Sequence, residues 1–271
     1  MTQELAMLFR TKHIVILLLN SLLSCAVFGQ IGGISASKLS SYTTIGINKH
    51  DVEFEPTFGT SLSSSYWDNN GNLINSNAIT QSSNIMWRVS YGLSHKTEVG
   101  FSIDSDASSV SIGMKTILSG GNKIQFSGMT GINLALGNRT FDPDKPGIDD
   151  VSSYAVGIIG SWFLNERNSV DANLTFQDYF KDVTNQTGSA VFVSADYGHY
   201  IENKSFQYLL SISYESSNIG TLNRSGLTIT PGVSIETGDN FLFVINTSHT
   251  LTGTNMDKSL GISIALTTTI H

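Results

Sequence analysis

Apolar and polar residues alternate at a period of two through most of the chain. From about residue 51 to the C-terminus, the alternation falls into twelve runs, most of them about ten residues long or slightly longer. A period of two places successive side chains on opposite faces of a β-strand. A strand that crosses a membrane at a tilt needs roughly 9–11 residues, whereas strands of soluble proteins average about 5–6. The pattern predicts an all-β protein, a 12-stranded antiparallel transmembrane β-barrel.

The stretch VSYGLSHKTEVGFSID, residues 89–104, shows the choice of faces within one predicted hairpin. Val99, Phe101 and Ile103 share one face of its second strand, and polar or small residues occupy the other. In an outer-membrane barrel the apolar face contacts lipid and the polar face lines a hydrated lumen. A lipocalin-like barrel or a sandwich is the soluble alternative. Its solvent face would carry many Lys and Glu, whereas the polar face here carries mostly Ser, Thr, Gly, Asn and Gln.

The connections between the runs alternate in length. Short turns are predicted at residues 93–97, 119–122, 165–168, 201–204 and 237–240. Longer links are predicted at residues 67–82, 137–150, 181–188, 216–224 and 251–257, and only 104–109 is short among this second group. Short periplasmic turns and longer extracellular loops are typical of outer-membrane barrels. An even number of strands then places both ends of the barrel in the periplasm.

Aromatic residues stand near the ends of the runs rather than in their middles. Membrane barrels place aromatic girdles at both membrane interfaces. The predicted girdle consists of Tyr66, Trp67, Tyr91, Trp162, Tyr179, Tyr197, Tyr214 and Phe241.

Composition supports this interpretation and excludes one class of partner. Charged residues make up 14% of the 271 residues, whereas about 25% is usual for soluble domains. The formal net charge is −7 and Lys and Arg form no cluster. Nucleic-acid binding relies on clustered basic residues, so no nucleic-acid partner is expected.

The N-terminal residues 1–29 read as a secretory signal peptide. Arg10 and Lys12 form its basic region, residues 14–23 its apolar region, and cleavage is predicted after Gly29. Cys25 is the single cysteine, and it ends a Leu-Leu-Ser-Cys sequence similar to a lipobox. Cys25 is therefore either a lipidated N-terminus or a residue lost with the signal peptide. No stretch after Gly29 has 18 consecutive apolar residues, so no transmembrane helix is expected there.

Residues 30–50 precede the alternating region and do not alternate themselves. They are rich in Ser and Gly and have few large side chains. They form either an N-terminal tail in the periplasm or a small plug inside the barrel. The barrel itself is predicted to comprise residues 51–271.

The inward phase of the runs carries nine charged residues. Seven are acidic and two are basic, which gives the predicted lumen a net charge of −5. Charged rings bias the passage of ions through a pore, so one interpretation is a channel that prefers cations. The other interpretation is that the basic residues bridge the carboxylates and brace the wall. The set comprises Glu53, Glu55, Arg88, Glu98, Lys115, Asp171, Asp196, Glu215 and Glu236.

The sequence offers no combination of residues for catalysis, a metal or a cofactor. The six histidines do not form a set of metal ligands. Ser248 and His249 are neighbours in one strand run, so their side chains point to opposite faces and cannot act together. The acidic segment 142–150 lacks the spacing of a calcium-binding EF-hand and is read as a solvated loop. The chain is therefore not expected to be an enzyme.

The hairpin also carries a resemblance to a known family. Residues 88–100, RVSYGLSHKTEVG, resemble a hairpin of the outer-membrane transporter family named for the meta-pathway of phenol degradation. Residues 52–58 resemble its first strand, and the signal ending Phe28-Gly29-Gln30 resembles those of Bacteroidota, which are Gram-negative. Barrel proteins commonly end in an aromatic residue that the assembly machinery recognises, whereas the last strand here ends in His271.

The resemblance implies a porin-like transporter in the outer membrane, with passive or facilitated passage of small solutes, among them hydrophobic compounds. Its implied partners are outer-membrane lipid, the barrel assembly machinery and a small-molecule solute. The alternative is a surface receptor or adhesin that does not conduct and binds through its extracellular loops.

Overall fold

The structure is a computed structural model that describes residues 31–35, 38–136, 151–180, 187–201, 205–219, 222–237 and 240–271. The predicted signal peptide lies outside these residues. The described part contains strands and connections, with no helix long and apolar enough to cross a membrane. The strands are β1 (Val52–Trp67), β2 (Leu73–Gly92), β3 (Thr97–Asp104), β4 (Ser109–Gly120), β5 (Ile124–Ala135), β6 (Ser153–Phe163), β7 (Asn168–Tyr179), β8 (Gly188–Tyr200), β9 (Phe206–Ile219), β10 (Leu222–Thr237), β11 (Phe241–Thr254) and β12 (Met256–Ile270).

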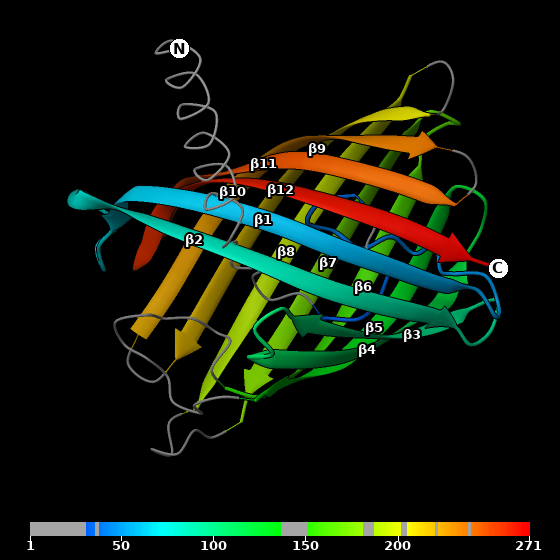
Figure 1. Cartoon of the computed structure of the whole chain (residues 1–271), viewed down its shortest axis with the longest axis horizontal. Helices are drawn as coiled ribbons and strands as arrows, with labels where there is room; N and C mark the ends of the chain where they lie inside the picture. The colour runs from blue at the N-terminus through cyan, green and yellow to red at the C-terminus, as the bar shows by residue number, and fades with distance from the viewer. Residues whose placement is uncertain are drawn as a thin grey trace, which may run out of the picture.

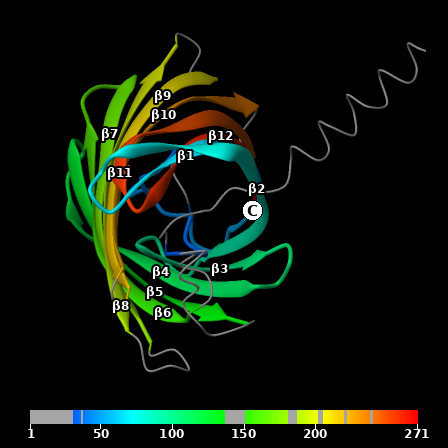
Figure 2. The same cartoon turned by 90° about the vertical axis from the view of Figure 1, so that its left-hand side faces the viewer.

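Each strand pairs antiparallel with its neighbour in the sequence, and β12 pairs with β1 to close the barrel. The closing seam runs from the pair Val52 and Ile270 to the pair Trp67 and Met256. Figures 1 and 2 show the closed wall, with the start of β1 beside the C-terminus at one end. We call this the terminal end of the barrel. The predicted all-β, 12-stranded antiparallel barrel is confirmed.

The outer surface of the barrel is apolar. The outward side chains of the strands include Ile112, Ile158 and Ile262, each about half exposed. A closed ladder satisfies the backbone hydrogen-bonding groups of every strand, and this is what allows β-structure to cross a lipid bilayer. The closed ladder and its aliphatic outer surface together describe a transmembrane barrel of the outer-membrane type.

At the end of the barrel opposite the termini, the strands extend further than the sequence predicts. The predicted link 67–82 is largely strand, because β1 and β2 are joined only by residues 68–72. The predicted links 216–224 and 251–257 are also mostly strand, since β9 and β10 are separated by two residues and β11 and β12 by one. Residues 73–84 are polar on both faces over much of their length, so the alternation that reveals a strand was absent there.

The lumen contains the described part of the segment before β1. Residues 31–35 and 38–50, which we call the plug, lie inside the wall, as the blue trace in Figure 2 shows. Ile31, Ile34 and Tyr42 of the plug are buried in one cluster with three residues of the wall, Met129, Ala155 and Ile159. Of the two arrangements considered for residues 30–50, the described part therefore takes the inward one.

Candidate functional site: the lumen and its plug

A row of small residues crosses the inner face of four strands. Gly100 on β3 pairs with Gly113 on β4, which pairs with Gly131 on β5, which pairs with Ala155 on β6. Because glycine has no side chain, this row of neighbouring small residues leaves a shallow track on the inner face of the wall. We call it the glycine track.

The start of the plug lies in the glycine track with its backbone against the wall. A Cβ added to Gly100 would stand 1.4 Å from the carbonyl oxygen of Gly33, and one added to Gly113 would stand 2.5 Å from that of Gly32. Gly33 itself has a φ of 87°, a conformation that favours glycine. The approach of two backbones therefore requires glycine on both the plug and the wall.

The β2–β3 hairpin holds the same part of the plug by hydrogen bonds. Ser90 donates through Oγ to the carbonyl oxygen of Gly33 at 2.7 Å. Arg88 donates to the carbonyl oxygen of Ile34 at 2.8 Å. The guanidinium also forms ion pairs with Glu53 at 2.8 Å and Glu55 at 2.7 Å. Arg88 thus neutralises two carboxylates of β1 and binds the plug at the same time.

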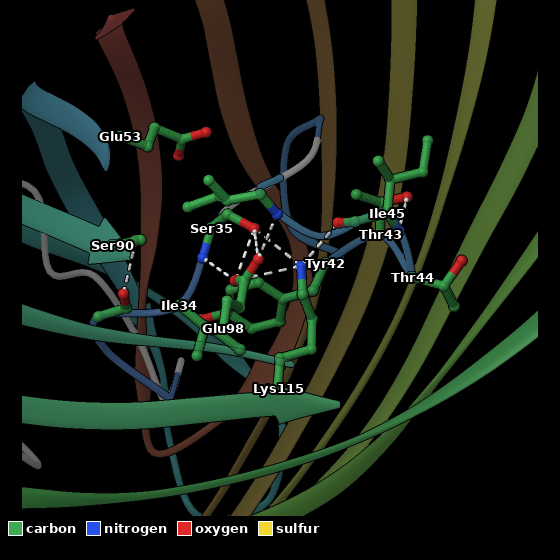
Figure 3. A network of polar contacts seen from close by, with 12 residues as sticks. Ile34, Ser35, Tyr42, Thr43, Thr44, Ile45, Glu53, Ser90, Glu98 and Lys115 are labelled. Carbon is green, nitrogen blue, oxygen red and sulfur yellow. Dashed lines mark hydrogen bonds and ion pairs between the residues drawn. The ribbon is translucent and has the colours of Figure 1, made fainter. Parts of the chain in front are cut away.

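Glu98 and Lys115 form the second contact between wall and plug (Figure 3). The Glu98 carboxylate accepts hydrogen bonds from the backbone nitrogen of Ser35 at 2.6 Å and from that of Ile47 at 3.0 Å. Lys115 donates to Ser35 Oγ at 2.8 Å and to the carbonyl oxygen of Ile45 at 2.9 Å. The two charged groups are 3.3 Å apart and almost fully buried. They join two separate parts of the plug to β3 and β4.

Residues 38–41, which we call the arm, reach the opposite side of the lumen. Lys38 Nζ lies 2.7 Å from the Asp171 carboxylate on β7. One oxygen of Asp196 on β8 accepts hydrogen bonds from three successive backbone nitrogens, at 2.8, 3.0 and 2.9 Å, those of Leu39, Ser40 and Ser41. Successive N–H groups that converge in this way form an anion-binding concavity. The plug here supplies that concavity and the wall supplies the anion.

The structure shows where each of the nine predicted lumen charges lies. Seven of them meet the plug directly or through Arg88, namely Glu53, Glu55, Arg88, Glu98, Lys115, Asp171 and Asp196, the last two being the carboxylates that receive the arm. Glu215 pairs with Arg224 at 3.4 Å, and Glu236 accepts a hydrogen bond from Tyr200 at 2.6 Å.

Two lumen cations were missing from the predicted set. Lys38 belongs to the plug, and Arg224 stands in the stretch that was predicted to be a loop. The one sequence signal for Lys38 was an isolated cation in a Ser/Gly-rich segment that precedes an acidic lumen. With these two included, each of the four basic residues described in the lumen lies in an ion pair.

A cavity of about 460 Å³ lies inside the barrel, between the plug and the inner face of the wall. Gly33, Ile34, Leu39 and Tyr42 form its floor. The inner surface of β9–β12, which we call the far wall, contributes mostly hydroxyl and amide side chains, among them Ser213, Thr228, Thr230, Asn246, Ser248, Thr250, Ser259, Ser263 and Thr267. The charged residues at its border include the Glu53, Glu55 and Arg88 cluster and the Glu215 and Arg224 pair.

Six of the eight predicted girdle residues have side chains that are not buried, namely Tyr66, Tyr91, Trp162, Tyr197, Tyr214 and Phe241. Trp67 and Tyr179 lie elsewhere, because their side chains are only 5% and 3% exposed. Tyr179 packs with Val151 and Ala190. Trp67 follows Ser63 and Ser65 on the buried phase of β1. The phase of a residue along its strand therefore predicts an outward-facing aromatic side chain better than its position near a strand end does.

At the terminal end of the barrel, the last residue contacts the segment that precedes β1. His271 Nδ1 lies 2.9 Å from the carboxylate of Asp51, just before β1, and Nε2 lies 3.1 Å from the side chain of Asn240. The hydrogen bond with His271 holds the pKa of Asp51 below its ordinary value. The terminal histidine, unusual for a barrel, therefore ties the last strand to the residue that precedes the first.

Among the described residues, no group of three or more His, Cys, Asp or Glu side chains could hold a metal ion. The acidic segment 142–150 lies outside the described residues. Ser248 lines the cavity whereas His249 does not, in keeping with the opposite faces of neighbouring strand residues.

Comparison with solved structures finds outer-membrane barrels. An outer membrane channel from Pseudomonas putida F1 is similar with a TM-score of 0.67 and 11% identity, over 84% of this chain and 98% of that one. The KdgM porin in complex with disordered oligogalacturonate has a TM-score of 0.53 and 8% identity, over 82% and 99%. The β domain of the Bordetella autotransporter Brka has a TM-score of 0.50 and 9% identity, over 82% and 100%.

No family model matches the sequence, and no curated protein sequence matches it. Membership of the phenol meta-pathway family therefore stays a prediction. At such low identities the structural similarity shows the fold, which is that of the outer-membrane channel and porin barrels.

Proposed function

We propose that this protein is an outer-membrane channel for small, neutral, polar solutes, and that the plug narrows its lumen. The observation that carries the proposal is the cavity of about 460 Å³ above the plug, whose far wall consists mainly of hydroxyl and amide groups. Hydroxyl and amide side chains both donate and accept hydrogen bonds, so they can replace the water around a polar, uncharged solute.

The arrangement of charges favours a neutral solute over an ion. From the sequence alone, the charges either bias the lumen toward cations or brace the wall. In the structure Lys38, Arg88, Lys115 and Arg224 compensate neighbouring carboxylates, and Asp196 is surrounded by N–H donors. Paired charges present a weaker field to a passing ion than an open ring of carboxylates does. The charges thus support the interpretation in which they brace the plug and the wall.

Hydrophobic compounds are among the small solutes that the family resemblance implies, and the hydroxyl and amide groups of the far wall favour polar solutes over them. An apolar solute on this wall would cover hydroxyl and amide groups without satisfying them, which is unfavourable. The receptor alternative needs surface loops; β1 and β2 are joined by five residues and β11 and β12 by one, which leaves the 17-residue connection between β5 and β6 as the longest on that end of the barrel. The KdgM porin, which has a similar fold, was solved with oligogalacturonate, a hydroxyl-rich sugar chain that also carries carboxylates, and this supports hydroxyl-rich solutes as a class.

The test is swelling of liposomes that contain the full-length protein, with uncharged sugars and polyols of graded size outside. We expect swelling that declines as the solute grows. Asn246→Leu, which makes the cavity wall apolar, should slow swelling. Thr247→Leu is the matched control, because the neighbouring residue is exposed on the outer face. A folded barrel that passes none of these solutes, or an equal effect of both variants, would contradict the proposal.

A further inference from the structure

We propose that the arm, residues 38–41, is the movable gate of the channel, and that Asp171 and Asp196 latch it to the wall, while residues 31–35 remain fixed. The proposal deepens the proposed function and rests on it. It follows from a difference in how the two parts of the plug are held.

Residues 31–35 are held by contacts that leave no room for movement. Ile31 and Ile34 are fully buried among apolar side chains. The backbone of Gly32 and Gly33 fills the glycine track so closely that no Cβ could stand between plug and wall. Moving this part would open a void in a packed cluster and expose apolar surface, and both are costly. Residues 31–35 therefore stay fixed to the wall.

The arm is held almost entirely by polar contacts to two carboxylates. Lys38 pairs with Asp171, and the next three backbone nitrogens bind Asp196. Lys38, Leu39 and Ser40 also line the cavity. Water from the cavity can replace each polar contact when the arm leaves the wall, so release exchanges hydrogen bonds instead of breaking apolar packing.

The arm also lies where a gate must lie, because it bridges the lumen. Ser35 and Tyr42, the nearest described residues before and after the arm, are bound on the β3–β6 side through Glu98 and the Met129 cluster. The arm itself meets β7 and β8, and Leu39 reaches β10, where a Cβ on Gly232 would stand 2.8 Å from its side chain. Release of the arm would clear the part of the lumen that the arm crosses, without unseating residues 31–35.

The first experiment removes the latch charges and keeps the shape of the side chains. Asp171→Asn with Asp196→Asn should raise the ratio of open to closed channel roughly tenfold or more, since two sets of charge-assisted hydrogen bonds are weakened. The readout is single-channel current of the full-length protein in planar bilayers. Asp178→Asn is the matched control, because Asp178 lies on β7 but bonds with the exposed Tyr154 on the outer face.

The second experiment locks the arm and does not depend on the charge variants being stable. The Oγ atoms of Ser41 and Ser194 are 2.9 Å apart, so Ser41→Cys with Ser194→Cys can form a disulfide between arm and wall. Oxidation should lower the current of this variant, and reduction of the same bilayer should restore it. Protease resistance of the barrel and mobility on a gel without heating show that each variant is folded.

The outcomes separate the gate from the channel. Higher current in the latch variant, unchanged current in the Asp178 control and loss of current on oxidation support the gate. Current or sugar-driven swelling that is equal in the wild type, the latch variant and the oxidised lock overturns the gate but leaves the channel. A folded barrel that passes neither ions nor sugars, with the arm either locked or unlatched, overturns the proposed function and the gate with it.

Discussion

The two sides of this barrel share a fold and differ in what their inner faces do. On β2–β8 the inner face carries the glycine track and the buried charges that bind the plug. On β9–β12 it carries mostly uncharged hydroxyl and amide groups that border the cavity. The outer faces of both sides are apolar because both meet the same lipid. The difference teaches that the two inner faces are built for different surroundings: one is complementary to the peptide of the plug, and the other borders an open cavity.

Removal of the Arg88 charge should break the plug-bearing side most severely. Arg88→Met leaves Glu53 and Glu55 without their buried partner and frees the carbonyl oxygen of Ile34. We expect the free energy of unfolding, measured by urea titration in lipid, to fall by about 3 kcal/mol. The exposed turn residue Arg167 supplies the control, since Arg167→Met should change it by no more than about 0.5 kcal/mol.

Neutralising both carboxylates of the Arg88 cluster gives that prediction a second check. Glu53→Gln with Glu55→Gln in the Arg88→Met background should recover part of the lost stability, because unpaired buried charge is the main cost. A triple variant as unstable as, or less stable than, Arg88→Met alone would show that the guanidinium acts through packing instead.

A methyl group in the glycine track should have the next largest effect. Gly100→Ala places a Cβ 1.4 Å from the Gly33 carbonyl oxygen, so strand and plug cannot both keep their positions. We expect a loss of about 1–3 kcal/mol and faster proteolysis of the N-terminal segment. Gly160→Ala on β6 is the control, because its Cβ would meet Phe126 at an ordinary 3.4 Å. Equal unfolding midpoints for the two variants would refute the role of the track.

Removal of a single hydroxyl group from each side should show the same contrast in stability between the plug-bearing side and the far wall. Ser90 is fully buried and donates to the plug, so Ser90→Ala should cost about 1 kcal/mol. Ser263 borders the cavity on the far wall, where water can take over its hydrogen bonds, so Ser263→Ala should cost less than about 0.5 kcal/mol. If Ser263→Ala costs as much as Ser90→Ala in urea titration, the two sides are not held differently.

Periodicity predicted the architecture because a period of two is imposed by strand geometry wherever one face meets lipid and the other does not. The same phase predicts an inner-face position for Glu98, Lys115 and Asp196, whose side chains contact the plug in the structure. It could not find their partners, because the plug has no alternation and its contacts depend on which strands stand opposite one another. Lys38 and Asp171 are 133 residues apart in the sequence, and no local pattern joins them.

Strand ends were harder to predict for a related physical reason. A stretch such as residues 73–84 is polar on both faces, so it lacks the contrast on which the prediction depends. The hairpin at residues 88–100 has a recognisable alternating pattern, but the pattern does not reveal that its inward residues contact the plug. Ser90, Glu98 and Gly100 are the residues that receive it.

The place of the plug in the sequence has a consequence for how the chain assembles. The contacts of residues 31–35 with Ser90 and Glu98 span only 57 to 63 positions, whereas the arm reaches Asp196 across about 155. Shorter loops lose less entropy on closure and generally form sooner. The first strands can therefore receive the plug as an open sheet, and the later strands then curl around a template already in place until β12 meets β1. A chain assembled in this order would enclose its plug, with no need to thread it through a finished pore.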